Sequence, residues 1–465
     1  MSLLTLYHRL PAGRARSAAA TLRGAYLSWW RYGAETERLV EEALGRESWS
    51  AERWQTWQEN RLSALLHRAA TRVPYYRQQW SARRAKGDRA SWEQLANWPV
   101  LEKRELREQP SAFVIDGCRR EWMFGDHTSG TTGSPVQLWW SRPALHEWYA
   151  LFEARCRRWF GVDRHTPWAI LGGQVVAHVS QREPPYWVWN AAMHQLYCSA
   201  YHLAPSAIPS YLDALASHGV RYVLGYPSAL EALARGAAGL TPPPLTVAMT
   251  NAEPLLAHQR DVIAQGLRCP VRETYGMAEA VTAASECAAG ALHLWPDAGV
   301  FELKGAADGG AGEVIATGLL NVDMPLIRYR VGDRAMLDAS ATPCACGRTL
   351  PRLSSVEGRT DDLLYTRDGR PVGRLDPVFK AAGRIQEAQI VQESIDRVRV
   401  RYVPAPGYQP ADGQAIAEEI RLRMGSIEVV LDEVLEIPRA ANGKFRAVIS
   451  RLTPEQRSRF QRQPA

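Results

Sequence analysis

The sequence predicts an α/β protein with a large N-terminal domain of mixed sheets and helices, followed by a small α+β domain. Its 465 residues allow two to four domains at roughly 100–200 residues each. Between about residues 112 and 340, apolar strand-like runs alternate with helical stretches, which is typical of a sheet covered on both faces. Sixteen of the seventeen tryptophans stand at or before Trp189, so the composition changes further along the chain.

The large domain is expected over residues 1–358 and begins with a mainly helical lead-in that ends near residue 110. Helical periodicity is visible there, for example at Leu62, Leu65 and Leu66. The alternation that follows predicts strands with helices between them. The expected strands are at 168–171, 222–224, 245–248 and 314–315, and the expected helices are at 227–236 and 254–266.

The small domain is expected over residues 362–465. Residues 389–391 and 398–403 alternate between apolar and polar side chains as strands do. Residues 415–424 have the pattern of an amphipathic helix. Strands and a helix in this short segment indicate an α+β unit.

Composition and charge exclude several classes of protein. Hydrophobic residues at 46% and charged residues at 23% are ordinary globular values. The 56 Lys and Arg exceed the 49 Asp and Glu by only seven, and arginines such as Arg155, Arg157 and Arg158 are expected on a solvated surface rather than against nucleic acid. No apolar run approaches the ~18 residues of a membrane span. Seven cysteines form no secreted disulfide framework, which favours the reducing cytoplasm.

The first 34 residues are basic and contain no Asp or Glu. Arginines recur through this segment, beside Trp29 and Trp30. The favoured interpretation is a basic helix that packs on the following domain. A peripheral contact with a membrane surface, or a transit peptide, stays open as the alternative.

A run of small hydroxylic residues and glycines, taken alone, is typical of either a phosphate-binding loop or an ordinary flexible turn. Its backbone amides can turn inward around phosphate oxygens, and its hydroxyls add donors. It differs from the G-x-x-x-x-G-K-[ST] phosphate loop. The segment comprises Thr128, Ser129, Gly130, Thr131, Thr132 and Gly133, and Pro135 ends it.

Five segments in this order resemble the adenylate-forming (AMP-forming acyl-CoA synthetase) superfamily. Within it, the chain is most similar to the phenylacetate–CoA ligase-like branch, and to its relatives in polysaccharide-biosynthesis clusters. The likeness extends from about residue 60 to 450. The five segments are the loop at 128–135, Tyr275-Gly-Met-Ala-Glu279, Arg328-Tyr-Arg-Val-Gly-Asp333, Gly358-Arg-Thr-Asp-Asp362 and Pro438-Arg-Ala-Ala-Asn-Gly-Lys444.

The resemblance implies ATP-dependent activation of a carboxylic acid as an acyl-adenylate, followed by transfer to the thiol of CoA. The loop would hold the β- and γ-phosphates, and Glu279 would bind Mg²⁺. Asp333 would accept hydrogen bonds from the ribose hydroxyls. The adenine would lie along Tyr275, Gly276 and Met277, with Ala252 and Glu253 nearby. Arg359 would contact ribose or phosphate, and Lys444 would act in adenylation. Residues 359–361 would form a hinge with Asp361 as its pivot, so the small α+β domain would be mobile.

Two positions depart from the superfamily pattern. Val136 stands where many members have a lysine after the loop, although this branch often lacks it. Ala278 stands where relatives usually have Thr or Ser, and the loss of one hydroxyl contact costs on the order of 1 kcal/mol. Slow or specialised adenylation is therefore compatible with the sequence.

Three functions remain open. The adenylate can pass to CoA, it can pass to an amine acceptor to give an amide, or the chain can be a nucleotide-binding homologue without turnover. The joint presence of Lys444, Glu279, Asp333 and Arg359 argues against the last. CoA is placed first on its frequency in the family. The aromatic residues at 186–189 suggest a flat, aromatic acid, or else a tryptophan-rich core, and an oligomer is compatible with the sequence.

Three cysteines and a histidine form a C-x₅-H…C-x-C pattern. Cys287, His293, Cys344 and Cys346 would suit a closed, tetrahedral Zn²⁺ site with a structural role. The spacing is not that of a classical zinc finger. Some members of the phenylacetate ligase-like branch carry zinc in this region, so the resemblance supports the site.

Overall fold

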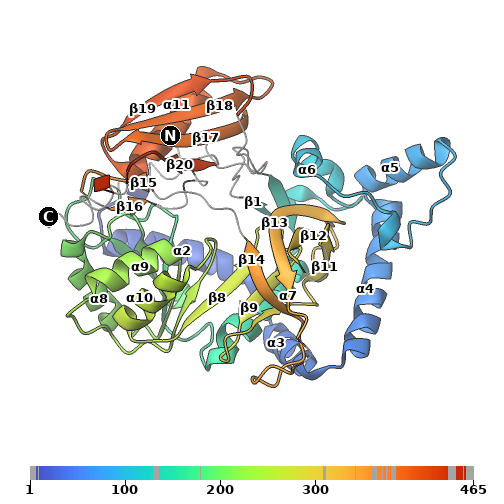
Figure 1. The fold of residues 1–465 in the computed structure, drawn as a ribbon, viewed down its shortest axis with the longest axis horizontal. Coiled ribbons are helices and arrows are strands. Elements are labelled where there is room, and N and C mark those ends of the chain that lie inside the picture. The colour runs from blue at the N-terminus through green and yellow to red at the C-terminus, as the bar shows by residue number, and fades with distance from the viewer. Residues whose placement is uncertain are drawn as a thin grey trace.

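A computed structural model describes most of the chain (Figure 1). The described residues are 7–8, 10–128, 136–178, 180–306, 310–340, 342–357, 364–368, 370–372, 375, 378, 384–437, 447–453 and 455–456.

The segment before residue 110 is helical, as the periodicity predicts. Ser50 caps one helix by accepting a hydrogen bond from the amide of Arg53 at 3.3 Å, and Pro74 occupies the first turn of the next. Figure 1 shows these two helices, α4 and α5, as an arm beside the large sheet. The helices are α2 (Arg14–Arg31), α3 (Thr36–Gly45), α4 (Ala51–Arg72), α5 (Pro74–Ala85) and α6 (Lys103–Glu108).

The large domain is built on one mixed sheet of twelve strands, in the order β11-β12-β13-β14-β10-β9-β8-β7-β6-β3-β5-β4. The neighbours β5, β3, β6, β7 and β8 are parallel, and the other pairs are antiparallel. The bounds are β3 (Trp168–Gly172), β4 (Trp187–Asn190), β5 (Gln195–Ser199), β6 (Tyr222–Gly225), β7 (Val247–Thr250), β8 (Val271–Gly276), β9 (Ala283–Glu286), β10 (Leu292–Leu294), β11 (Gly299–Lys304), β12 (Gly312–Gly318), β13 (Tyr329–Leu337) and β14 (Arg352–Glu357).

Helices cover both faces of the parallel part of the sheet. Val223 on β6 faces a cluster that includes Leu230 of α9, whereas the adjacent Tyr222 and Leu224 face a cluster that includes Val40 of α3. All four residues of β6 are buried, as expected for a strand covered on both sides. The α/β class is thus confirmed. The helices are α7 (Arg142–Phe152), α8 (Ile208–Ser217), α9 (Pro227–Gly236) and α10 (Ala257–Leu267).

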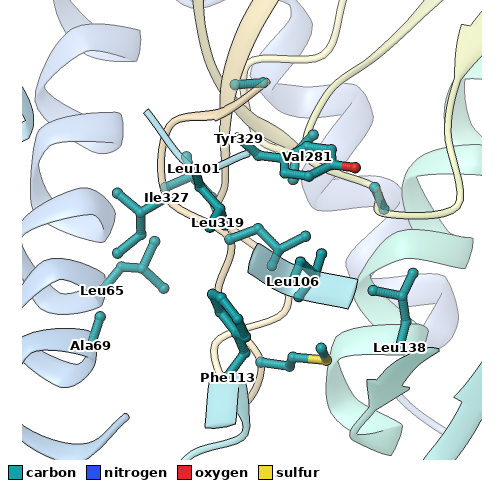
Figure 2. Close-up of a cluster of buried hydrophobic side chains, with 14 of the residues drawn as sticks. Leu65, Ala69, Leu101, Leu106, Phe113, Leu138, Val281, Leu319, Ile327 and Tyr329 are labelled. Atoms are coloured by element: carbon teal, nitrogen blue, oxygen red, sulfur yellow. The ribbon is translucent and has the colours of Figure 1, made fainter. Parts of the chain in front are cut away.

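The helical lead-in packs on the antiparallel part of the sheet. Figure 2 shows Leu65 of α4 and Leu106 of α6 converging with Phe113 on Ile327 and Tyr329. The hairpin of β1 (Phe124–His127) and β2 (Gln137–Trp140) joins this core through its buried apolar residues. This packing brings α6 next to β13.

The C-terminal segment forms a four-stranded sheet in the order β19-β18-β17-β20. One helix, α11 (Pro410–Met424), packs on it through Ile416 and Ile420. Figure 1 shows this unit above the part of the large domain that carries α8, α9 and α10. The strands of this sheet are β17 (Ile385–Ser394), β18 (Arg397–Pro404), β19 (Glu428–Glu433) and β20 (Val448–Ser450). A separate two-stranded sheet pairs β15 (Leu364–Tyr365) with β16 (Pro371–Val372).

The basic N-terminal helix α2 lies against the edge strand β4. The Ser17 hydroxyl accepts from the Trp189 amide at 3.1 Å, and the Thr21 hydroxyl accepts from the Ala191 amide at 3.1 Å. At Gly24 the two elements are so close that a Cβ would lie 2.0 Å from the Asn190 side chain. Within the described part of the chain, no helix combines the length and apolar character needed to cross a membrane.

One expectation about the arginine-rich segment is wrong. Arg155 and Arg157 are buried, because a short π-helical turn at Glu153–Arg157 directs both side chains inward. Arg155 binds Asp297 with two hydrogen bonds, at 2.5 and 2.9 Å. Arg157 binds Glu153 at 2.8 Å. In each pair the attraction between the charges offsets the free-energy cost of removing them from water. A sequence pattern does not reveal such partners.

Candidate active site

The carboxyl ends of the parallel strands meet at one edge of the sheet, where α/β proteins commonly bind ligands. β7 ends at Thr250 and leads into Asn251, whose amide donates to the carbonyl of Gly225 at the end of β6, at 3.1 Å. Ala252 then adopts a left-handed backbone with φ of 70°, which is strained for a residue with a Cβ. This turn joins the ends of two neighbouring strands.

Glu253 fixes the same turn to helix α9. Its carboxylate accepts from the amide of Ser228 at 3.1 Å and from the Ser228 hydroxyl at 3.0 Å. Ser228 lies in the first turn of α9, where free amides and the helix dipole favour a negative charge. Glu253 therefore has a clear structural role as a helix cap, and it places the backbone of Ala252 beside the site.

Tyr275 and Asp333 come together from β8 and β13. The Tyr275 hydroxyl donates a hydrogen bond to Asp333 Oδ2 at 3.1 Å. Gly276 follows at the end of β8, and a Cβ there would meet only Ala283 at 3.9 Å. The carbonyl of Met277 accepts from the amide of Ala280 at 3.0 Å. An aromatic ring, a carboxylate and open space beside Gly276 thus adjoin one another.

Glu279 is a buried carboxylate with two partners. The Tyr329 hydroxyl donates to its Oε1 at 2.7 Å, and the Lys103 Nζ lies 3.7 Å from the same oxygen. Tyr329 begins β13 and Lys103 begins α6, so the packing of the lead-in helices on the sheet creates this contact. The charged ammonium and the phenol hold the carboxylate in place.

Hydrogen bonds join Thr128 to Val136, the residues that flank the predicted phosphate-binding loop. Thr128 follows β1, and its Oγ1 accepts from the amide of Val136 at 2.9 Å. In return the Thr128 amide donates to the Val136 carbonyl at 3.0 Å. Ser129, Gly130, Thr131, Thr132 and Gly133 lie outside the described residues.

The four residues of the cysteine–histidine pattern gather at the end of β9, on β10 and in the connection from β13 to β14. Their potential ligand atoms all lie within 4.8 Å of one another. Cys287 and Cys344 have sulfurs 3.7 Å apart, and Cys346 Sγ lies 3.4 Å from His293 Nε2. Because His293 Nδ1 lies 3.1 Å from the Leu350 carbonyl, it carries the proton and leaves the Nε2 lone pair for a ligand.

The protonation of these groups depends on their surroundings. Burial lowers the pKa of His293, which keeps its imidazole neutral. Burial opposes a thiolate at Cys346, but hydrogen bonds from Arg348 and neighbouring thiols bring its pKa below the ordinary value. Burial raises the pKa of Cys287 to about 11. A bound cation would reverse that effect, since a coordinating thiol loses its proton.

A network of buried charges supports this cluster. Arg348 Nε donates to Glu47 Oε2 at 2.7 Å, and the Thr349 amide donates to the Glu47 carbonyl at 2.9 Å. Glu47 also lies 3.5 Å from the buried Arg155, which binds Asp297. The loop that carries Cys346 is therefore anchored to the core of the large domain.

Comparisons with known proteins place the chain among its relatives. Residues 364–451 match the family model described as the CapK C-terminal domain. Protein CapK of Staphylococcus aureus is 25% identical over 366 residues, which cover 76% of this chain and 80% of that protein. Phenylacetate-coenzyme A ligase of Thermus thermophilus is 25% identical over 471 residues, which cover 90% of this chain and 99% of the ligase. The chain is a relative of the phenylacetate–CoA ligase-like adenylate-forming proteins.

The fold agrees with this relationship. The crystal structure of 2-hydroxyisobutyryl-CoA ligase in the postadenylation state, in complex with 2-HIB-AMP, matches with a TM-score of 0.54 at 21% identity. The match covers 90% of this chain and 94% of that chain. At this level of identity the likeness concerns the fold, which both proteins share over nearly their whole length.

Three of the residues predicted for the active site are not among those that the structure describes. Arg359, Asp361 and Lys444 lie outside the described residues, so their roles and the hinge stay predictions. Conversely, sequence reasoning missed Lys103 and the role of Tyr329. Tyr329 stands inside one of the five segments, whereas Lys103 carried no signal, because an isolated lysine in a helix is usually solvated.

The aromatic residues near residue 186 are explained by packing. Trp187 contacts Tyr211 of α8 with ring centroids 5.7 Å apart, and Trp189 contacts His218 at 4.9 Å. Tyr186 stacks on the ring of His202 at 4.8 Å. These contacts show that the aromatic side chains of this segment pack against the protein itself. An aromatic substrate stays a prediction.

Proposed function

We propose that the protein activates a carboxylic acid with ATP as an acyl-adenylate and then transfers the acyl group to the thiol of CoA. The observation that carries the proposal is the convergence of Tyr275 on β8 and Asp333 on β13. Glu279 follows β8 in a turn and is bound by Tyr329 at the start of β13. Relatives named phenylacetate-coenzyme A ligase support the same reaction class.

The chemistry has two displacements. A carboxylate oxygen attacks the α-phosphorus of ATP, an acyl–phosphate bond forms, and pyrophosphate leaves. The CoA sulfur then attacks the acyl carbon, a thioester forms, and AMP leaves. The first step develops negative charge on the phosphate oxygens, so positive and hydrogen-bonding groups around them lower its barrier.

The described residues can bind and orient the nucleotide for this step. Asp333 would accept the ribose hydroxyls, exchanging its bond to Tyr275 for two charge-assisted ones. The Tyr275 ring would lie along the adenine, beside the backbone at Ala252 and the gap at Gly276. Thr128, which flanks the predicted loop, would set the direction in which the following amides approach the phosphates.

Glu279 fits the role of a Mg²⁺ ligand, since it is a buried carboxylate that Tyr329 holds in position and Mg²⁺ prefers oxygen ligands. Bound there, the cation would neutralise charge on the phosphate oxygens. Lys103 would add a fixed positive charge at the same place. Val136 is fully buried and apolar, so it cannot supply the charge that many superfamily members obtain from a lysine at that position. We therefore assign to Lys103 the binding of the leaving pyrophosphate.

Two further residues complete the proposed machinery. Lys444 would bridge the carboxylate and the α-phosphate in adenylation, and Arg359 would contact the ribose or a phosphate. Both follow from the family resemblance alone. The small domain that carries Lys444 is proposed to rotate about Asp361 between the two half-reactions.

The cysteine–histidine cluster fits a structural Zn²⁺. Three sulfurs and one imidazole nitrogen within 4.8 Å of one another form a soft, four-ligand set without an open position. The cation would hold the β13–β14 connection to β9 and β10. Its contribution is to folding, because no ligand atom remains for a substrate.

Exchange of labelled pyrophosphate into ATP tests the first half-reaction without any acceptor. A panel of aryl, alkyl and hydroxy acids is screened, with Glu279→Gln as the isosteric variant and Glu302→Gln as its matched control. We expect acid-dependent exchange that Glu279→Gln abolishes and Glu302→Gln retains. If the wild-type protein binds ATP but exchanges no pyrophosphate with any acid, the proposal fails in favour of a non-catalytic homologue.

A second assay, with an acid that supports pyrophosphate exchange, identifies the acceptor of the acyl group. Thioester formation is measured with CoA, and amide formation with amino acids and amino sugars. A thioester as the main product supports transfer to CoA. Amide formation with CoA left unused would replace that part of the proposal by an amine-acceptor reaction.

A further inference from the structure

Helix α2 exposes apolar side chains on the face that points to solvent. Leu22, Tyr26 and Trp29 are 75%, 55% and 52% exposed. Their spacing of four and three residues places them on one side of the helix, where Ala18 and Ala25 are exposed as well. Among the described residues, eight large apolar side chains are exposed, and three of them form this stripe.

The opposite face of α2 is already used. Gly24 and Trp30 are buried against the large domain, and Ser17 and Thr21 bind the backbone around β4. These contacts hold the helix flat along the protein surface with the stripe directed outward. A soluble helix normally reverses this arrangement, with its outer face polar. The exposed stripe therefore indicates a surface that binds something outside the chain.

The charged side chains of α2 itself are all arginines. Arg14 and Arg23 are exposed and, by helical periodicity, border the stripe on opposite sides. Neither forms an ion pair with another described residue. A third arginine, Arg142 of α7, lies over the Trp29 ring at 4.2 Å and donates to the Trp29 carbonyl. No acidic residue occurs in the first 34 positions.

The geometry points to an anionic lipid surface as the partner of this stripe. An in-plane helix with Leu, Tyr and Trp outward and arginines at its edges can insert its apolar side chains at the boundary between headgroups and acyl chains. Tyr and Trp suit that boundary because each combines an apolar ring with a polar tip. The arginines attract acidic headgroups. A second copy fits less well, since it would bring the same positive borders together.

Vesicle co-sedimentation of the full chain tests this proposal. Vesicles of phosphatidylcholine alone are compared with vesicles that also contain phosphatidylglycerol. We expect binding to the mixed vesicles, and weaker binding when added salt shortens the Debye length from about 10 Å at 0.1 M to about 3 Å at 1 M. The doubly substituted chain Leu22→Glu with Tyr26→Glu should bind about tenfold more weakly or worse.

The matched control is Leu435→Glu, which makes the same change at a 98% exposed leucine of the C-terminal unit. It should bind like the wild type. Thermal melting of all three proteins excludes misfolding, which is not expected for exposed positions. Absence of wild-type binding to mixed vesicles, or equal binding by the double variant, would overturn the proposal. So would self-association of the wild type that the double variant loses, since the stripe would then be an interface between copies.

Discussion

Lys103 and Glu279 meet from distant parts of the chain, with the Lys103 ammonium 3.7 Å from Glu279 Oε1. The lysine starts α6 in the helical lead-in, and the glutamate follows β8 of the sheet. Only the packing of α6 against β13, through Leu106 and the core shown in Figure 2, brings them together. The lead-in is therefore proposed to be part of the active site rather than an appendage to it.

Replacing Lys103 with methionine should slow pyrophosphate exchange by ~10- to 100-fold. The change removes the charge and keeps most of the side-chain volume, so the packing of α6 should survive. The loss corresponds to about 1.4–3 kcal/mol in the barrier, which is typical of a charge that acts on a developing anion. Lys86→Met, at an exposed lysine after α5, is the control. Unchanged exchange in Lys103→Met would remove this residue from the proposed machinery.

The pair of Tyr275 and Asp333 predicts two different losses of ATP affinity. Asp333→Ala removes the carboxylate proposed for the ribose and should raise the Kd for ATP by ~10- to 100-fold, as for hydrogen bonds to a charged group. Tyr275→Phe keeps the ring and should cost about fivefold or less. Calorimetric titration with ATP measures both, and Asp261→Ala is the surface control. Equal losses in the two variants would contradict separate ribose and adenine contacts.

Local signals in the sequence located many elements of the large domain. The helix expected at residues 227–236 coincides with α9, because Pro227 suits a first turn and Gly236 suits an end. The strand expected at 245–248 is found as Val247–Thr250, where pairing with β6 begins only after Leu245. A run of apolar residues shows that a strand exists, whereas the partner strand decides its ends.

Contacts between distant segments could not be predicted in the same way. The Tyr275–Asp333 bond joins β8 to β13, which β9, β10 and β14 separate in the order of the twelve-stranded sheet, so no local pattern predicts it. The burial of Arg155 depends on Asp297, a partner in the turn between β10 and β11 that lies far along the chain. The cysteine–histidine cluster was accessible from sequence because its four ligands share a chemistry that stands out from the background.

One zinc ion per chain is expected in the purified protein, and elemental analysis measures it. Cys344→Ser should lower the zinc content and reduce the melting temperature by about 5 °C or more, since a closed site contributes to folding. The Kd for ATP should change far less. Cys118→Ser, at an exposed cysteine, is the control and should change neither property. Purified wild-type protein with almost no zinc would contradict the assignment.

The low pKa of His202 predicts that the folded protein loses stability in acid. Burial, reinforced by the charge of Arg370, lowers its pKa to about 4, and its ring stacks on Tyr186 while Nδ1 lies 2.8 Å from the Ser199 hydroxyl. Because the folded pKa lies below the unfolded value of about 6.5, the unfolded state binds the extra proton between these values. The stability is therefore fully present above pH 6.5 and is lost as the pH falls towards 4, by at most ~3 kcal/mol.

Urea unfolding at pH 7 and pH 5 measures this effect. His202→Asn keeps an acceptor for the Ser199 hydroxyl and cannot be protonated, so the difference in free energy of unfolding between the two pH values should shrink. His258→Gln, at an exposed histidine, should leave the difference as in the wild type. If His202→Asn left the pH dependence unchanged, other titrating groups would be responsible for the loss of stability at low pH.

Replacement of Lys444 should affect the two proposed half-reactions differently. An ammonium between the carboxylate and the α-phosphate helps adenylation and has no task once the adenylate exists. Lys444→Ala should therefore slow pyrophosphate exchange by roughly 10²-fold or more, about 3 kcal/mol in the barrier, while CoA transfer from a supplied acyl-adenylate stays nearly normal. Asp361→Pro, which restricts the proposed pivot, should instead impair passage between the steps, because a hinge residue must absorb large backbone changes. Single-turnover assays of each half-reaction distinguish these patterns. If Lys444→Ala slowed both half-reactions equally, the lysine would serve folding, and the alternation of the small domain would lose its main support in this protein.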